Sequence, residues 1–121
     1  TSEQFKALNK TLSYYRVMAI TDNLEKMLAA GRDSAMLRFG LGSAYFNQRQ
    51  FVEATEHLRA CIEQDSNYTA AYKLLGRALM KTQQPELAQQ IFERGLPVAQ
   101  AQGDKQTERE INAFLTKLSR T

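Results

Sequence analysis

Few side chains in this sequence have the chemistry to act as catalysts or metal ligands. His57 is the only histidine and Cys61 the only cysteine, so neither has a second residue of its own kind with which to build a metal site. Glu108 and Glu110 are two residues apart, and residues at that spacing do not face each other on a helix, as paired catalytic carboxylates must. We predict a protein that is not an enzyme, that binds no metal ion or cofactor, and in which His57 is a partly exposed surface residue.

A phosphate-binding loop is not predicted either. Such loops join a strand to a helix, whereas the glycines of the stretch GLGSAY, residues 40–45, lie among apolar residues with helical spacing. Gly42 in the interior of a helix should cost about 1 kcal/mol relative to alanine. We therefore expect that close packing against another helix requires a glycine at this position.

Length and composition predict a single soluble domain. The chain has 121 residues, of which 43% are hydrophobic and 24% charged, enough for one modest core. Basic and acidic residues alternate and the formal net charge is only +3, which does not favour nucleic acid as a partner. The single Cys61 cannot form an internal disulfide, and we expect neither a bilayer-spanning segment nor a signal peptide. We expect a cytoplasmic protein.

The spacing of apolar residues predicts helices almost throughout. These residues recur at steps of three and four over residues 51–62 and 74–79, which is the pattern of an amphipathic helix. No alternation typical of strands occurs. Polar residues interrupt the pattern at 48–50 and 82–85, and each interruption leaves room only for a short turn between two helices.

The chain matches itself after one constant shift, which is the separation between Gly42 and Gly76. The same shift relates three further pairs, Ala54 and Ala88, Leu58 and Phe92, and Ile62 and Leu96. A fixed period of this length, about 34 residues, indicates stacked helical hairpins.

This pattern resembles the tetratricopeptide repeat (TPR). The resemblance implies an all-α fold, a right-handed α-solenoid of helical hairpins with flanking capping helices. The residues expected to pack the two repeats, 35–68 and 69–102, are Leu41, Gly42, Tyr45, Ala54, Leu58, Tyr72, Leu75, Gly76, Ala88 and Phe92. A β-carbon on Gly42 or Gly76 would then collide with the partner helix, near Ala54 and Ala88 respectively. Cys61 would occupy the place of a small apolar core residue.

Helices are also expected at both ends, because repeat hairpins bury their apolar faces only against neighbours. Residues 18–34 are predicted to form an N-terminal capping helix, with Thr21 as its N-cap and Gly31 as its stop.

Residues 103–121 are predicted to form a C-terminal capping helix, with Asp104 as its N-cap. The segment GDKQTEREINAFLTKL resembles the C-terminal helix of small bacterial TPR proteins of unassigned function. In that resemblance Phe114 and Leu115 are its core anchors.

Residues 1–17 allow two interpretations. Their apolar residues with the spacing of one helix face are Phe5, Leu8, Leu12 and Tyr15, which favours a helical extension that caps the domain. Met18, however, opens the stretch MAITDNLEKML, which resembles the start of the same small bacterial proteins, so the segment is alternatively a foreign peptide or tag. In either case its tethering would give it a high effective concentration for a groove of its own chain, and it would bind there in cis or in a neighbouring molecule.

The family resemblance also selects the residues of a concave groove. They are Met36, Phe39, Ser43, Phe46 and Asn47 from the first repeat, and Ala70, Lys73, Arg77, Met80 and Lys81 from the second. The first half is mainly apolar and aromatic, and the second is basic. The resemblance implies a non-catalytic adaptor whose groove binds a peptide or helix of another protein. A partner segment with both apolar and acidic residues would match the two halves.

Other interpretations of these residues remain open. Lys73, Arg77 and Lys81, one helical turn apart, would also make an ordinary solvated face. Self-association through the groove or an end helix would make the chain a structural TPR protein and a possible homodimer. An accessory role in nucleic-acid binding would need features that the sequence does not show, and no membrane partner is expected.

A narrower prediction concerns chaperone tails. Lys73 and Arg77 match the lysine and arginine with which chaperone-binding members of the family hold a C-terminal carboxylate. Phe39 and Ser43 stand where the lysine and asparagine of that clamp would be. Recognition of a terminal carboxylate of that kind is therefore not expected.

Overall fold

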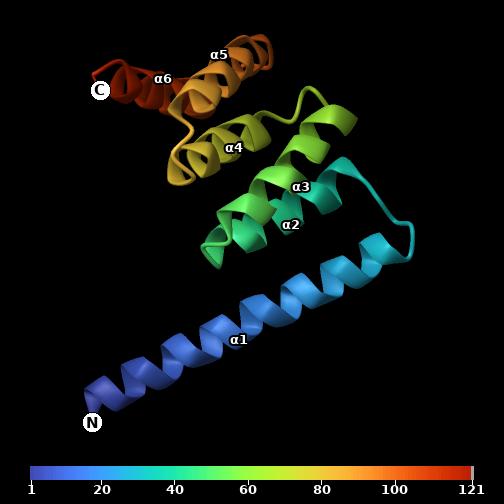
Figure 1. Cartoon of the computed structure of the whole chain (residues 1–121), viewed down its shortest axis with the longest axis vertical. Helices are drawn as coiled ribbons and strands as arrows, with labels where there is room; N and C mark the ends of the chain where they lie inside the picture. Colours follow the sequence, from blue (N-terminus) through green and yellow to red (C-terminus); the bar gives the residue numbers. More distant parts are fainter. Residues whose placement is uncertain (121) are drawn as a thin grey trace.

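In the part of the chain that the structure describes, residues 1–120, the fold consists of helices and short turns. The computed structural model contains six helices and no strand within these residues (Figure 1). Their bounds are Ser2–Ala29 for α1, Ala35–Asn47 for α2, Phe51–Gln64 for α3, Thr69–Lys81 for α4, Pro85–Ala101 for α5 and Lys105–Ser119 for α6. The predicted all-α fold is confirmed.

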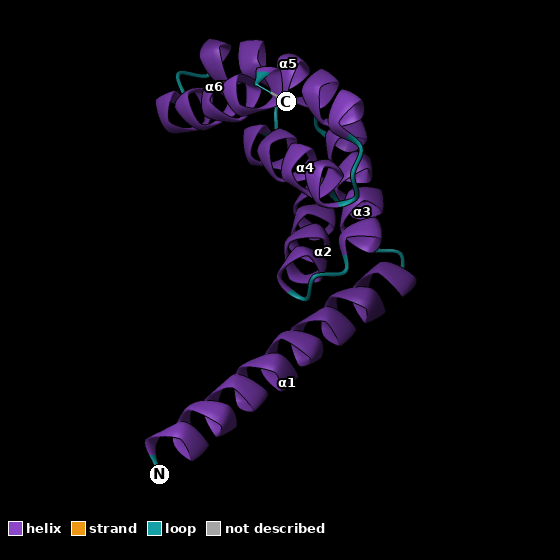
Figure 2. Ribbon diagram, turned by 60° about the vertical axis from the view of Figure 1, so that its left-hand side comes forward, coloured by secondary structure: helices purple, strands orange, loops and turns teal. Residues whose placement is uncertain are grey.

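The helices after α1 form a curved stack. α2 and α3 make one hairpin, α4 and α5 a second, and α6 packs on α5 and α4. α4 also packs against α2, whereas the backbones of α3 and α5 do not approach each other closely among these described helices. α2, α4 and α6 therefore line the inner side of the curve, and α3 and α5 its outer side (Figure 2).

The two hairpins close with the same turn, at equivalent positions of the repeat. Arg49 and Gln83 adopt left-handed backbone conformations, with φ of 63° and 59°. Residues other than glycine adopt this conformation only at some cost in energy. In both turns the backbone N–H of the next residue donates to the carbonyl five residues earlier, at 2.9 Å. The repeat seen in the sequence is therefore a repeat of backbone geometry.

Gly42 and Gly76 lie where the first helix of each hairpin crosses the second. A β-carbon on Gly42 would lie 2.5 Å from Cγ of Leu58, and one on Gly76 would overlap the ring of Phe92. Leu58 and Phe92 are fully buried, so neither can leave its position without opening the core. Tight packing against these side chains explains why both helices accept the propensity cost of a glycine, about 1 kcal/mol.

The neighbours of these glycines differ from the predicted ones. Ala54 and Ala88 are buried, but they are not the nearest groups to a β-carbon at either glycine. The small alanines allow the helices to approach, and larger side chains one turn further on fill the space. Gly95 has a related role on α5, because its β-carbon would lie 2.5 Å from Cβ of Tyr72.

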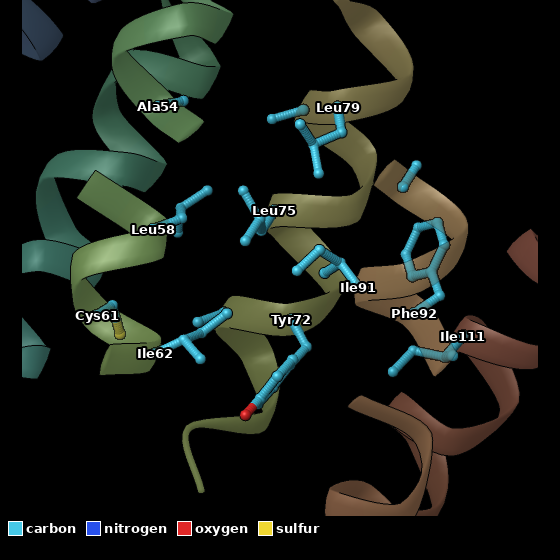
Figure 3. Close-up of a cluster of buried hydrophobic side chains, with 13 residues drawn as sticks. Ala54, Leu58, Cys61, Ile62, Tyr72, Leu75, Leu79, Ile91, Phe92 and Ile111 are labelled. Atoms are coloured by element: carbon cyan, nitrogen blue, oxygen red, sulfur yellow. The ribbon is translucent and has the colours of Figure 1, made fainter. Parts of the chain in front are cut away.

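One continuous apolar core joins the two hairpins to α6 (Figure 3). Its buried members are Ala54, Leu58, Cys61, Ile62, Ala71, Tyr72, Leu75, Ala78, Leu79, Ala88, Ile91, Phe92 and Ile111. Ile111 comes from α6, and Cys61 lies in the core, as expected. Of the predicted packing residues, Tyr45 alone is only half-buried, because its hydroxyl donates to Glu25 of α1 at 2.8 Å.

α1 is one continuous helix, which corrects the predicted helix start at Thr21. No break separates residues 17 and 18. The N-cap is Thr1 rather than Thr21, and its hydroxyl oxygen accepts a hydrogen bond from the backbone N–H three residues on, at 3.1 Å. Thr21 instead lies buried in mid-helix, where its hydroxyl donates to the carbonyl of Val17 at 2.9 Å.

The predicted stop after α1 and the predicted N-cap of α6 are both found. Gly31 and Gly103 adopt left-handed conformations, with φ of 85° and 69°, directly after α1 and α5, as glycines that stop helices do. Asp104 then caps α6, and its carboxylate accepts from the backbone N–H of Thr107 at 3.1 Å. Within residues 1–120, none of the helices combines the length and apolar character needed to cross a bilayer.

Candidate partner-binding groove

The α2 half of the predicted groove is partly filled by its own aromatic neighbours. Its residues are Met36, Phe39, Ser43, Phe46 and Asn47. The ring of Phe39 lies 4.9 Å from that of Tyr68, and the ring of Phe46 lies 5.1 Å from that of Phe51. Met36 is open to solvent, with an exposed fraction of 75%. This half offers an apolar wall rather than a deep cavity.

The basic half, on α4, is only partly free for a ligand. Nζ of Lys73 lies 2.7 Å from Oε2 of Glu110 on α6, and this hydrogen bond lowers the pKa of Glu110 below its usual value. The guanidinium of Arg77 lies over the ring of Phe46, 4.9 Å from its centre. Lys73 therefore joins α4 to α6, and a partner's carboxylate would have to displace Glu110 to reach it.

A cavity of about 420 Å³ opens between α4 and α6. Its lining residues are Arg77, Met80 and Lys81 from α4, and Phe114 and Lys117 from α6. Three of the predicted groove residues therefore meet here, and two further residues join them. Because α4 and α6 are inner helices, the cavity faces the concave side of the stack.

The cavity combines a basic rim with apolar side chains. Arg77, Lys81 and Lys117 supply three positive charges around Met80 and Phe114. Within residues 1–120, no ion pair engages Lys81 or Lys117. Both lysines are exposed, so an incoming carboxylate reaches them without first displacing a protein group. The site is suited to an apolar side chain flanked by acidic groups.

Sequence reasoning placed Phe114 in the core and did not assign Lys117 to the groove. Phe114 has both roles, because its ring stacks 5.2 Å from that of buried Phe92 while it also lines the cavity. The missed signal is the register of α6. Leu75 and buried Ile111 are separated by the same number of residues as Lys81 and Lys117. α6 therefore repeats the pattern of α4, but with a shift two residues longer than the repeat.

Asn47, also assigned to the groove, contributes to a different hollow. This hollow has a volume of about 220 Å³ and lies between α1 and the end of α2, and its lining residues are Lys10, Ser13, Tyr14, Val17, Asn47 and Gln48. Among the described helices, α1 packs along α2 and also reaches His57 of α3 through Glu25. Residues 1–17 therefore do not fill the cavity between α4 and α6 of their own chain in this structure.

His57 is buried, which corrects the expectation of a surface histidine. Nη1 of Arg38 lies 3.0 Å from its Nδ1. Because a guanidinium can only donate, Nδ1 accepts, and the ring proton lies on Nε2, which faces Oε1 of Glu25 at 3.4 Å. The ring also stacks on Tyr45 at 5.5 Å between centres. Burial lowers the pKa of His57 below its usual value, so the neutral ring is favoured.

The same polar cluster links the loop before α2 to α3. Arg38 binds both carboxylate oxygens of Asp33, at 2.8 and 2.9 Å, and Gln64 donates to the same carboxylate at 2.8 Å. The hydrogen bonds from Arg38 and Gln64 lower the pKa of Asp33 to about 2. We assign His57 and Arg38 to this structural cluster, which holds α1 against the first hairpin.

The described residues do not assemble a metal site or an activated thiol. No group of three or more histidine, cysteine, aspartate or glutamate side chains with metal-binding geometry occurs in residues 1–120. Burial raises the pKa of Cys61 to about 11, so its thiol stays protonated and is a poor nucleophile.

Comparison with known proteins assigns this arrangement to a class. The tetratricopeptide repeat family matches residues 45–105, which include most of both hairpins. A TPR repeat-containing protein of Pseudomonas aeruginosa, PA0015, is 48% identical over 99 residues, which cover 82% of this chain and 94% of that protein. The chain belongs to the tetratricopeptide repeat family.

Solved structures agree with this assignment. Protein BPP2914 of Bordetella parapertussis is 44% identical, with a TM-score of 0.73, and the match covers 84% of this chain and 88% of that one. The first TPR of Spaghetti (RPAP3), bound to the HSP90 peptide SRMEEVD, is 25% identical with a TM-score of 0.75, covering 93% and 84% of the two chains. The TPR2B domain of yeast Sti1, in a complex with an Hsp70 peptide, has a TM-score of 0.80 over 93% and 90% of the chains but only 17% identity, and shows the fold alone. The fold is that of a protein-interaction module.

Proposed function

We propose that this protein is a non-catalytic adaptor that binds a segment of a partner protein on its concave side. The cavity between α4 and α6 is the observation that carries the proposal. An apolar side chain of the partner inserts beside Met80 and Phe114. Acidic groups next to it in the partner segment pair with Arg77, Lys81 and Lys117. The partner peptide named with RPAP3, SRMEEVD, likewise combines apolar and acidic residues, which supports this choice of ligand.

The proposed ligand is an internal segment rather than a chaperone's terminal carboxylate. Lys73, one of the two matching clamp residues, is paired with Glu110. Phe39 and Ser43 occupy the positions where the clamp of chaperone-binding relatives would need lysine and asparagine. A groove of this size without a large buried anchor fits a micromolar affinity, about −8 kcal/mol. We place the adaptor in the cytoplasm, where the thiol of Cys61 stays reduced.

The proposal is tested by selecting peptides from a random displayed library on the purified chain. We expect the selected peptides to share an apolar residue flanked by aspartate or glutamate. Binding of a selected peptide is then compared between the parent and the double variant Lys81→Glu with Lys117→Glu. Reversing two charges at the rim should weaken binding at least about tenfold, because each close charge pair contributes to affinity.

A matched control reverses two charges on the outer side of the curve. Arg59 and Arg94 are exposed residues of α3 and α5, and the double variant Arg59→Glu with Arg94→Glu carries the same change in net charge. It should bind the selected peptide like the parent. Equal binding by the Lys81 and Lys117 variant, or selected peptides without acidic residues, would contradict the proposal.

A further inference from the structure

The first half of α1 carries a row of large apolar side chains that no other helix covers. Phe5, Leu8, Leu12 and Tyr15, which we call the α1 seam, have exposed fractions of 65%, 55%, 50% and 63%. Figure 1 shows this half of α1 extending beyond the hairpins. A contiguous exposed apolar row of this kind is typical of an interaction surface.

The α1 seam lies on the side of the helix that faces away from the domain. At 100° per residue, it is about 180° from the residues with which α1 contacts the first hairpin, such as Thr21 and Leu24. The hairpins therefore do not obstruct a partner that approaches the seam. The steps of three, four and three residues along the seam are the a and d spacing of two coiled-coil heptads, so the complementary surface is another helix.

We propose that the α1 seam pairs with the α1 seam of a second copy of this chain, with the two helices antiparallel about a two-fold axis. Phe5 of one copy packs on Tyr15 of the other, and Leu8 packs on Leu12. Each contact occurs twice, as a two-fold interface requires. This interface is separate from the proposed partner groove and does not depend on it.

Charge supports a second copy as the occupant. Most positions that flank the seam are uncharged, among them Gln4, Asn9 and Thr11. The exception is Arg16, which in the antiparallel pair lies beside Ser2 of the other copy, so no like charges meet across the interface. An antiparallel pair also opposes the two helix dipoles and keeps the two sets of hairpins at opposite ends.

Charge also argues against the alternative that residues 1–17 bind the groove of a neighbouring molecule. This segment contains three basic residues and one acidic residue. The cavity between α4 and α6 has a rim of three basic side chains. Basic groups of the segment would therefore meet basic groups of the rim and repel them. The segment would also lack the acidic groups with which the rim is suited to pair.

The size of the interface predicts a weak dimer. Four side chains from each copy, two of them aromatic, would bury roughly 800 Å² in total. Stable interfaces bury about 1,200–2,000 Å². We expect a dissociation constant on the order of 100 µM, so dimers form at high local concentration and separate on dilution.

Sedimentation velocity of the full chain, from about 10 µM to about 1 mM, tests the pairing. The average mass of the parent should rise from 13.8 kDa towards twice that value. The variant Leu8→Glu with Leu12→Glu should stay monomeric throughout. Because neither leucine contacts the hairpins, its circular dichroism spectrum and urea midpoint at low concentration should match those of the parent.

The control variant Lys6→Glu with Lys10→Glu has the same spacing on the opposite side of α1, and it should dimerise like the parent. A parent that is monomeric at about 1 mM, or a Leu8 and Leu12 variant that still dimerises, would overturn the proposal. Binding of the monomeric parent to vesicles of phosphatidylcholine and phosphatidylserine, without self-association, would show that the seam is a membrane-binding surface instead.

Disulfide cross-linking tests the antiparallel orientation. Asn9 lies near the two-fold axis of the proposed pair, whereas Lys10 lies on the opposite side of α1, where it lines the hollow between α1 and α2. Asn9→Cys should therefore form a covalent dimer on oxidation at high concentration, and Lys10→Cys should not. Equal cross-linking of the two variants, or none in either, would contradict the orientation. Cys61 does not interfere, because it is buried in the core.

Discussion

The two hairpins have the same backbone geometry, but different interactions attach them to the helices at the two ends. The first hairpin packs against α1 and the second against α6. Arg38 and His57 in the first hairpin occupy the same repeat positions as Tyr72 and Ile91 in the second. The first pair is polar and reaches Glu25 of α1. The second pair is apolar and belongs to the core that continues into α6. One repeat fold therefore accepts either a hydrogen-bonded or an apolar junction at its ends.

The core of the second hairpin should be the more sensitive to truncation. Phe92 is fully buried, fills the space above Gly76 and stacks on Phe114, so Phe92→Ala should lower the free energy of unfolding by about 4 kcal/mol. Leu58→Ala, at the same repeat position in the first hairpin, should cost about 3 kcal/mol. Urea denaturation measures both values. A larger loss for Leu58→Ala would contradict this comparison.

Adding a β-carbon at Gly42 or Gly76 should lower the free energy of unfolding by less than these truncations do. The second hairpin should again be the more sensitive of the two. Gly76→Ala places a methyl group against the rigid ring of Phe92 and should cost about 2 kcal/mol. Gly42→Ala meets Leu58, a more flexible side chain, and should cost about 1 kcal/mol. Gly40→Ala is the control, since its β-carbon would make an ordinary contact with Leu24 at 3.4 Å. That variant should be neutral or slightly stabilised in the same denaturation experiment.

The polar junction should make the first hairpin sensitive to pH. Burial lowers the pKa of His57 from its usual value of 6.5, so below about pH 6.5 the unfolded state binds more protons than the folded state. Stability should therefore fall as the pH drops from 7.5 to 5.5. Protonation would also remove the acceptor that Nδ1 offers to Arg38, while Glu25 and Glu56 oppose the effect by favouring the charged ring.

The variant His57→Ile copies the apolar residue of the second hairpin and should remove this pH dependence. Urea midpoints of parent and variant at pH 7.5 and 5.5 make the comparison. Asp33 does not affect the comparison between pH 7.5 and 5.5. Its pKa is about 2, so its contribution to stability is lost only as the pH falls from about 3.8 towards 2. An unchanged pH dependence in the variant would show that His57 is not the cause.

The repeat region could be predicted from the sequence because its signals are local and occur twice. The crossing glycine, the turn and the apolar spacing of the first hairpin all return one repeat later, as Gly42 returns in Gly76, and the helices follow from them. Three residues assigned to the groove, Arg77, Met80 and Lys81, line the cavity, and their role in binding a partner stays a prediction. The contribution of α6 was missed, because Lys117 follows Lys81 at a separation longer than the repeat.

The N-terminal region was harder to predict because its signals conflict. Thr21 has the residue type of an N-cap, but in α1 its hydroxyl bonds to the carbonyl of Val17 one turn earlier, so the helix continues through it. The burial of His57 was missed for another reason. It depends on Arg38, Glu25 and Tyr45, which come from other helices, and no local pattern reveals that they meet.

The central claim is that the concave side between α4 and α6 recognises an apolar and acidic segment. The most direct test is a titration of the isotope-labelled full chain with a selected peptide, followed by backbone amide chemical shifts. We expect the largest changes on α4 and α6, around Met80, Lys81 and Phe114. Changes centred on the outer helices α3 and α5, or on α1, would contradict it.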